Sequence, residues 1–490
     1  MTRQRASFVV MILVASLAGG CLGGSRPDKP RGSALWVSRD SGDLDAATQS
    51  RLAALGVKEI YLDAAELTFD GGVHLRKIKA PSIPRGTPTT LVIYGIWSPG
   101  DRPPEQLATG LASELSSLRI DAEQRGLKVN GYHLEVRPGT DLESMSKTLP
   151  RVRSRLGGQL LLSAGLTRGE LEGRGAQTIA NVVDYVVSSL YGQRPGEGED
   201  SAAWDFEAVE AHLRQLEHLH KPYVVGAITL GTATWRGHDG SAKATSTMLS
   251  LGDLVSNRSF ELKGGFSLQA IDRQVWEFAA LGPVKVGDWN VAKGESIRLV
   301  RTATPLMEEL LRRVGASESP LHIGELFFRL PQAGERLSLS VDNLVDVLSP
   351  AAATPQLELA VEKIATSAST WKVRVKIANR SSESTDLAFI DSNYVELLAR
   401  GATIGEIELG DFHRFDLLVD GEKGTIRSIR QANTVRLNLP LLEENHEAAS
   451  GAIELKLTQR TPEISISASF LLTDGRTLTI APQIWQFDKK

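Results

Sequence analysis

The chain has 490 residues, of which 41% are hydrophobic and 23% are charged, and its formal net charge is −4. This composition is that of a globular protein with enough apolar side chains for large cores, and the charge balance excludes the basic surface that nucleic-acid binding requires. The single cysteine excludes an internal disulfide and a cysteine-based metal site. Because an α/β barrel with insertions absorbs roughly 300 residues or more as one unit, we expect two domains.

The N-terminus has the pattern of a secretory signal peptide. Arg3 and Arg5 precede an apolar run over residues 8–17 that is too short to span a bilayer as a mature helix, and three small residues then precede Cys21. Cleavage before a cysteine resembles the lipobox of bacterial lipoproteins, although Leu17 lies four positions before the cysteine instead of three. The resemblance implies that Cys21 becomes lipidated. An ordinary secretory signal with an incidental cysteine is the alternative.

Residues 1–21 are therefore predicted to be a lipoprotein signal peptide, and the Gly/Ser/Pro-rich residues 22–33 a flexible tether. The lipid anchor implies attachment to a bilayer in the bacterial cell envelope. Leu22 stands where retention in the inner membrane is often signalled by aspartate, which favours the outer membrane or the periplasmic face.

Strand-like apolar runs alternate with helix-like segments over residues 34–348, which is typical of βα units that form a parallel sheet. A hairpin over residues 66–78 follows the second strand, and the βα rhythm stops over residues 231–321. We therefore predict a protein of the α/β class, a (β/α)8 TIM-like barrel with an insertion after strand seven. Its strands are expected at residues 34–38, 60–63, 90–95, 129–137, 159–164, 185–191, 223–228 and 324–330.

The pattern changes after residues 349–355, which form a linker by composition. In residues 356–490 apolar and polar residues alternate with a period of two, as in 371–377 and 464–470. Asp-Gly pairs supply hairpin turns. The period predicts a C-terminal all-β sandwich domain.

The fourth predicted strand carries the best candidates for chemistry, because it ends in Glu135 and Arg137 and the carboxyl ends of barrel strands line the active-site face. Cleavage of a glycosidic bond usually needs two carboxyl groups about 5 to 9.5 Å apart. Asp63 and Glu66 lie on or just after the second strand, and Glu325 lies on the eighth. We take Glu135, Asp63 and Glu66 as the candidate catalytic residues. An ion pair between Glu135 and Arg137, which face the same way on one strand, is the alternative.

Aromatic side chains near strand ends and loops are candidates for stacking on sugar rings. Most aromatic residues of a barrel belong to its core, so we expect only one or two of them to line a pocket. Together with Arg137, the candidate substrate-binding residues are Tyr94, Trp97, Tyr132, Tyr191 and Trp235.

No motif predicts a cofactor. His212, His218 and His220 lack the i, i+4 spacing of metal-binding histidines on a helix, and the two at the helix end complement its dipole. No glycine-rich phosphate-binding motif follows a strand and no G-x-S-x-G motif is present, so nucleotide binding and serine hydrolysis are not expected.

The order of these parts resembles the chitinase-like glycoside hydrolases, and still more an uncharacterised bacterial lipoprotein family with a predicted TIM barrel. The resemblance rests on residues 131–137, 184–192 and 324–331. The fourth strand of the chitinase-like family reads D-G-x-D-x-D-x-E, which ends in the proton donor. Here only Gly131 and the carboxylate of Glu135 match, and Arg137 stands at the donor position, where an arginine cannot give up a proton.

The resemblance implies a membrane-anchored, glycosidase-like barrel that binds or hydrolyses an envelope or extracellular polysaccharide. A non-catalytic binding or assembly lipoprotein with a degenerate barrel is the alternative, and Arg137 favours it. A fold by itself does not establish an activity.

Overall fold

The computed structural model describes residues 32–137, 139–171, 173–190, 206–264, 274–302, 304–317, 319–332, 334–349, 356–381, 383–388, 392–422, 431–472 and 476–485. The predicted signal peptide with Cys21, residues 22–31 of the predicted tether, residues 350–355 of the predicted linker 349–355, and Tyr191 lie outside the described residues. Ser33, predicted in the tether, begins β1. No helix within the described ranges is long and apolar enough to cross a membrane.

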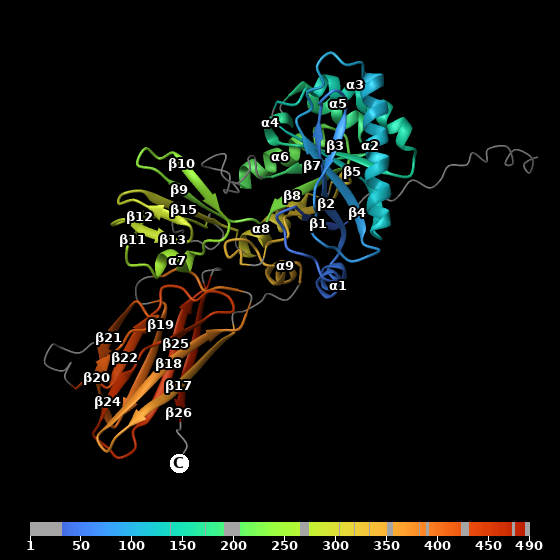
Figure 1. Cartoon of the computed structure of the whole chain (residues 1–490). Coiled ribbons are helices and arrows are strands. Elements are labelled where there is room, and N and C mark those ends of the chain that lie inside the picture. The colour runs from blue at the N-terminus through green and yellow to red at the C-terminus, as the bar shows by residue number, and fades with distance from the viewer. Residues whose placement is uncertain are drawn as a thin grey trace, which may run out of the picture.

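Eight parallel strands form a closed barrel, in the order β1-β16-β8-β7-β6-β5-β4-β2, and the pairing of β1 with β2 closes it (Figure 1). The predicted barrel is thereby confirmed. The strands are β1 (Ser33–Val37), β2 (Val57–Thr68), β4 (Pro88–Gly95), β5 (Lys128–Val136), β6 (Leu161–Leu166), β7 (Tyr185–Ser189), β8 (Tyr223–Ile228) and β16 (His322–Phe328). The strand β3 (His74–Lys77) pairs antiparallel with β2 and forms the predicted hairpin.

Along each strand, side chains that point into the barrel alternate with side chains that point out toward the helices. Trp36, Tyr61 and Tyr94 point inward and share one buried cluster. Leu62 and Leu91, at the intervening positions, pack in the larger core between the strands and the helices. The inside of the barrel is therefore filled by aromatic side chains, and these form a base beneath the carboxyl ends of the strands.

Helices surround the barrel, but none follows β2 (Figure 1). The β2–β3 hairpin and an irregular segment over residues 78–87 connect β2 to β4 instead. The helices are α1 (Ala46–Ala54), α2 (Pro104–Gln124), α3 (Leu142–Leu156), α4 (Arg168–Leu171), α5 (Arg174–Val182), α6 (Phe206–His218), α8 (Thr304–Ala316) and α9 (Val341–Leu348).

The insertion after β8 is built around a five-stranded antiparallel sheet, in the order β10-β9-β15-β12-β11, with its own core. Helix α8 falls within the range predicted for the insertion, but its apolar face packs in the core of the barrel, so the inserted sheet ends at β15. The elements are β9 (Thr232–Arg236), β10 (Ala242–Ser246), α7 (Leu251–Val255), β11 (Phe260–Gly264), β12 (Gln274–Ala280), β13 (Val284–Val286), β14 (Trp289–Val291) and β15 (Ser296–Arg301).

Two five-stranded antiparallel sheets follow the barrel and share one hydrophobic core, which agrees with the period of two in the sequence. The first contains β17 (Leu357–Thr366), β18 (Thr370–Asn379), β20 (Ala402–Ile407), β23 (Glu447–Ala449) and β24 (Ile453–Leu457). The second contains β19 (Tyr394–Arg400), β21 (Arg414–Leu418), β22 (Thr434–Asn438), β25 (Glu463–Leu471) and β26 (Thr477–Trp485). We call these two sheets the C-terminal sheets.

Candidate functional site

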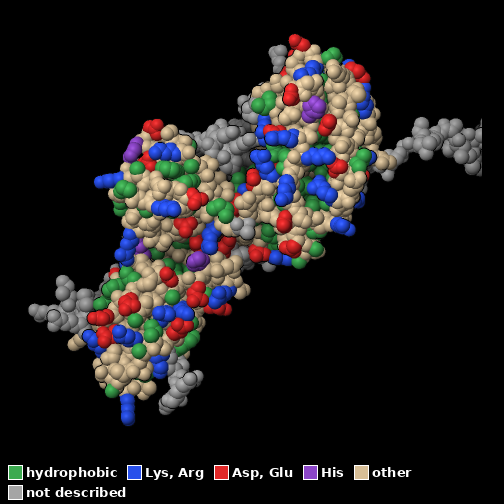
Figure 2. All heavy atoms as spheres, in the orientation of Figure 1, with side chains coloured by type: hydrophobic (Ala, Val, Ile, Leu, Met, Phe, Trp, Pro, Cys, Tyr) green, Lys and Arg blue, Asp and Glu red, His purple; other side chains and the backbone are tan. Residues whose placement is uncertain are grey.

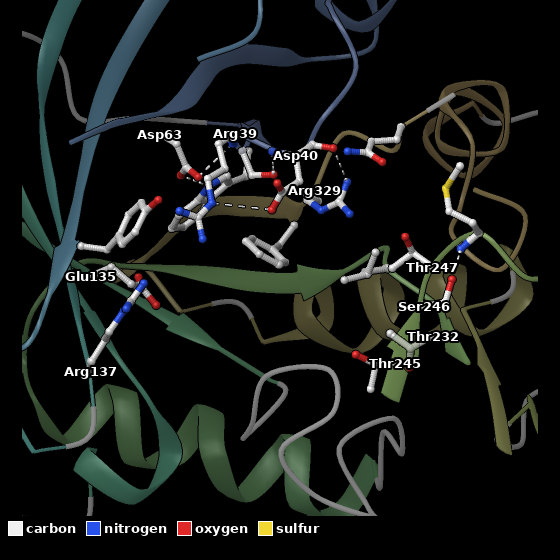
Figure 3. A pocket seen from close by; sticks show the side chains of 17 residues that line it. Arg39, Asp40, Asp63, Glu135, Arg137, Thr232, Thr245, Ser246, Thr247 and Arg329 are labelled. Atoms are coloured by element: carbon white, nitrogen blue, oxygen red, sulfur yellow. Dashed lines mark hydrogen bonds and ion pairs between the residues drawn. The ribbon is translucent and has the colours of Figure 1, made fainter. Parts of the chain in front are cut away.

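A cavity of about 620 Å³ opens at the carboxyl ends of β1, β2, β4, β5 and β16, between the barrel and the insertion. Figure 3 shows Asp63, Glu135 and Arg137 on the barrel side, and Thr232, Thr245 and Ser246 on the insertion side. We call it the barrel-top pocket. It is lined by Trp36, Ser38, Arg39, Asp40, Asp63, Tyr94, Glu135, Arg137, Leu230, Thr232, Thr245, Ser246, Thr247, Met248, Phe328, Arg329 and Gln332.

Asp63 is a buried carboxylate in the wall of this pocket. It points inward from β2, where Trp36 Nε1 donates to its Oδ1 at 2.8 Å and the backbone N–H of Arg39 donates to its Oδ2 at 3.1 Å. Burial raises the pKa of Asp63, although these two hydrogen bonds lower it, and the charge of Glu135 raises it further. Asp63 therefore holds a proton at higher pH than an exposed aspartic acid does.

Glu135 is tied to the inside of the barrel by a histidine. His133, two residues earlier on β5, is fully buried, and its Nε2 lies 2.9 Å from Glu135 Oε2. Its Nδ1 lies 3.0 Å from the hydroxyl of Ser163, which is also buried, on β6. The order Ser163–His133–Glu135 places the serine at the buried end, so the serine is not accessible as a nucleophile. These two hydrogen bonds orient the half-buried carboxylate of Glu135.

Arg137 lies against an aromatic ring. Its guanidinium carbon is 4.6 Å from the ring centroid of Tyr94 at the end of β4, and that of Arg39 is 5.8 Å from the same ring. Attraction between a cation and an aromatic face orients both groups. The structure thus shows His133 as a partner of Glu135 and Tyr94 as a partner of Arg137.

The loop after β16 is also fixed. Arg329 follows β16 and is buried with Glu335, with 2.7 Å between its Nη2 and Glu335 Oε1. Glu335 also accepts from the backbone N–H of Gln332 at 3.1 Å, which fixes the loop that carries Gln332. Hydroxyl groups on and beside β9 and β10 face the barrel across the cavity (Figure 3), and Met248 lies exposed at the rim.

Of the three candidate catalytic residues, Asp63 and Glu135 line the barrel-top pocket and Glu66 does not. Glu66 lies near the end of β2, where this strand pairs with β4 and with β3, and it forms an ion pair with Arg76 of the hairpin, which lowers its pKa. Glu325 also lies outside the pocket, beside Ser33 and His322.

Of the candidate aromatic residues, only Tyr94 is placed by the structure in the barrel-top pocket. Trp97, Tyr132 and Trp235 do not line this pocket, and the expectation was that only one or two of the aromatic candidates would. Trp97 is buried against Phe69, with its Nε1 3.2 Å from Ser144 Oγ.

Tyr132 points outward from β5, and its hydroxyl donates to the carbonyl of Leu115 on α2 at 2.8 Å. Outward residues of a barrel strand pack under the helices, so this ring is closed to a ligand. Trp235 donates from Nε1 to Glu295 at 2.9 Å, and Lys243 contacts both residues. These contacts fix Trp235 within the inserted sheet.

Several residues of the site were not predicted from the sequence, among them Trp36, Arg39 and Arg329, which line the pocket, and His133, which lies buried behind Glu135. His133 carries a readable signal, because it shares the inward face of the strand with Glu135. The others lie on segments whose neighbours are distant in the chain. No group of three or more metal-ligating side chains occurs among the residues that the structure describes. His212 is buried, and its Nε2 lies 2.9 Å from Ser188 Oγ.

No protein-family model and no curated protein matches the chain. Among solved structures, it is similar to a chitinase from Chromobacterium violaceum ATCC 12472, with 12% identity over 65% of this chain and 98% of that chain and a TM-score of 0.41. The spore cortex-lytic enzyme SleL of Bacillus cereus matches with 14% identity, 65% and 74% coverage and a TM-score of 0.39. The chitinase-like agglutinin of Robinia pseudoacacia matches with 12% identity, 64% and 99% coverage and a TM-score of 0.39.

Proposed function

We propose that the barrel-top pocket binds a carbohydrate chain. The observation that carries this proposal is the composition of one cavity, in which aromatic rings at the base meet carboxylate, guanidinium and hydroxyl groups from two opposite walls. Sugars present apolar ring faces and a rim of hydroxyl groups that both donate and accept hydrogen bonds. Aromatic rings and paired polar groups complement these two properties.

Binding without cleavage is the form of this function that the geometry supports best. Arg137 occupies the position from which the chitinase-like resemblance would require a proton donor, and it lies over Tyr94. A guanidinium stays charged at every working pH, so it supplies hydrogen bonds to a ligand and no proton.

Hydrolysis by Asp63 and Glu135 is the second candidate, and the raised pKa of Asp63 favours it. A carboxyl group that keeps its proton serves as a general acid, while an ionised one nearby serves as base or nucleophile. In this reaction Asp63 would protonate the leaving glycosidic oxygen. Glu135, held by His133, would attack the sugar carbon or activate a water molecule.

The location follows from the predicted lipid anchor at Cys21. An anchored protein with a carbohydrate pocket is suited to a polysaccharide of the bacterial envelope or its surroundings, and we propose this class of ligand. Incorporation of radiolabelled palmitate by the full-length chain, and its loss in Cys21→Ala, would test the anchor.

The test of the pocket uses the full-length protein on an array of envelope and plant polysaccharides, with reducing ends counted for every glycan that binds. Glu135→Gln and Asp63→Asn are the pocket variants, and Glu325→Gln, outside the pocket, is the matched control. Binding that weakens in both pocket variants and persists in the control is the expected result. New reducing ends that disappear in both pocket variants would establish hydrolysis. Binding that is unchanged in both would contradict the proposal.

A further inference from the structure

A second cavity, of about 650 Å³, lies on the outside of the barrel where no helix follows β2. Its walls come from the loop after β1, the irregular segment after β3 and the end of α2. We call it the outer groove. It is lined by Arg39, Ser41, Asp43, Leu62, Lys79, Ala80, Pro81, Ser82, Ile83, Arg125 and Leu127.

Hydrogen bonds hold the walls of the outer groove in place. Asp43 Oδ1 accepts from the backbone N–H of Ser82 at 2.7 Å, and the backbone N–H of Leu44 donates to the carbonyl of Ser82 at 2.9 Å. On the other side, the backbone N–H of Gly86 donates to the carbonyl of Gly126 at 2.8 Å. The irregular segment is thus hydrogen-bonded to the loop after β1 and to the residues after α2, so the groove is formed before any ligand enters.

The lining of the groove is basic. It contains three cations, Arg39, Lys79 and Arg125, against one carboxylate, Asp43, which the backbone N–H of Ser82 already engages. Figure 2 shows Lys and Arg side chains gathered on the barrel around β2 and β3.

Two of the nearby cations, Arg76 and Lys77 on β3, are neutralised by Glu66 and Asp121. Within the described part of the chain, Lys79 and Arg125 are exposed and form no such ion pair. The groove therefore keeps two cations that are available to an anion.

The outer groove adjoins the barrel-top pocket, because Arg39 lines both cavities. A ligand that extends from one cavity passes this residue to reach the other. From this juxtaposition we propose that the outer groove binds the anionic groups of an acidic polysaccharide. The anion preference rests on the groove alone, whereas the choice of a polysaccharide rests on the function proposed for the pocket.

A matched pair of polymers tests this proposal at low salt, carboxymethyl-dextran and unmodified dextran of the same length, with the full-length protein. The wild-type protein is expected to bind the carboxylated polymer at least about tenfold more tightly. The net charge of −4 excludes general attraction as the cause. The double variant Lys79→Gln/Arg125→Gln should lose roughly fivefold in affinity for the carboxylated polymer and nothing for dextran. Lys285→Gln/Lys293→Gln, two exposed lysines of the insertion, makes the same change of charge and should bind like the wild type.

Equal affinity for both polymers, or equal losses in both double variants, would overturn the inference and leave the proposed pocket function standing. Vesicles of phosphatidylglycerol and of phosphatidylcholine form a further arm. Binding to the anionic vesicles that requires Lys79 and Arg125, without a preference for carboxymethyl-dextran, would assign the groove to a membrane surface and also overturn the proposal. Failure of the pocket function itself is read separately, from unchanged carbohydrate binding in Glu135→Gln and Asp63→Asn.

Discussion

At the level of single residues, the polar side chains of the barrel-top pocket are held by buried hydrogen bonds. The carboxylate of Asp63 is held by Trp36 and the backbone of Arg39, and that of Glu135 is held by His133. Each polar group is therefore oriented before a ligand arrives. Such pre-organisation reduces the entropy that binding costs, but it makes the orientation of Glu135 depend on His133, which is buried and does not line the pocket.

His133→Ala tests this dependence. The substitution removes a fully buried ring and its hydrogen bonds to Glu135 and Ser163, so the free energy of unfolding should fall by about 3 kcal/mol. Urea denaturation measures it, with His74→Ala, an exposed histidine of the hairpin, as the control. A loss below about 1 kcal/mol would show that the buried contacts contribute little.

Glu335→Gln tests the buried ion pair in the loop after β16. The substitution leaves the charge of Arg329 buried without its counter-charge, which should destabilise the protein by about 3 kcal/mol. The control is Glu362→Gln, which breaks an exposed pair with Lys376 and should cost less than about 1 kcal/mol. Equal melting temperatures for the two variants would contradict the role given to burial.

At the level of secondary-structure elements, close packing between β5 and β6 positions the side chain of Glu135. A Cβ atom at Gly131 of β5 would overlap the carbonyl oxygen of Leu161, and one at Gly165 of β6 would overlap Glu135 Oε2. Glycine at these two positions lets β5 and β6 approach and leaves room for the carboxylate. The position of Glu135 thus depends on β6 as well as on its own strand.

Gly165→Ala should displace the carboxylate of Glu135 and weaken carbohydrate binding by about tenfold, with a smaller effect on stability. Isothermal titration with the glycan found on the array measures the affinity, and thermal unfolding measures the stability. Gly158→Ala is the control, because a Cβ atom there meets nothing within 4 Å. Unchanged affinity in Gly165→Ala would contradict the placement of Glu135.

The elements that the sequence predicted well are those with local signals. Apolar runs bounded by turn residues predicted β8 and β7 within two residues, and the Asp70-Gly71-Gly72 turn predicted the β2–β3 hairpin. Within the site, Asp63 and Glu135 were predictable because strand ends carry them. Arg39 and the hydroxyl groups of the insertion were not, since their places depend on the closure of β1 onto β2 and on how the inserted sheet folds back. Tyr132 was predicted to bind substrate, but it lies three residues before Glu135 on β5, so its side chain points outward to α2.

At the level of the whole molecule, the barrel, the insertion and the C-terminal sheets meet at a junction that contains buried carboxylates (Figure 1). Glu383 accepts from Thr304 of α8 and from Asn343 of α9. Glu443 accepts from the backbone N–H of Gly252 in α7 at 3.3 Å. The C-terminal sheets are therefore bonded to both the barrel and the insertion, and their attachment depends on the charge state of this junction.

Glu444 should make this junction sensitive to pH. Burial raises the pKa of Glu444 to about 7, with the charges of Glu383 and Glu443 adding to the rise and Arg301 opposing it. A raised carboxyl pKa means that the folded protein binds the proton more tightly. The stabilisation is therefore present below the ordinary pKa of a glutamic acid and is lost as the pH rises through about 7.

Thermal unfolding between about pH 5.5 and pH 8.5 measures this loss. The free energy of unfolding of the wild-type protein should fall by roughly 2 kcal/mol over this range. In Glu444→Gln the side chain is uncharged at every pH, so the fall should be smaller. Glu406→Gln, on the exposed part of β20, is the control and should behave like the wild type. A fall of the same size in Glu444→Gln would assign the pH dependence to another group.

A crystal structure of the full-length protein with the glycan found on the array tests whether carbohydrate binds in the barrel-top pocket. We predict a sugar ring in contact with Trp36 or Tyr94, with sugar hydroxyl groups hydrogen-bonded to Asp63 or Glu135 and to the hydroxyl groups of the insertion. An empty pocket, with the glycan bound to the C-terminal sheets, would contradict it.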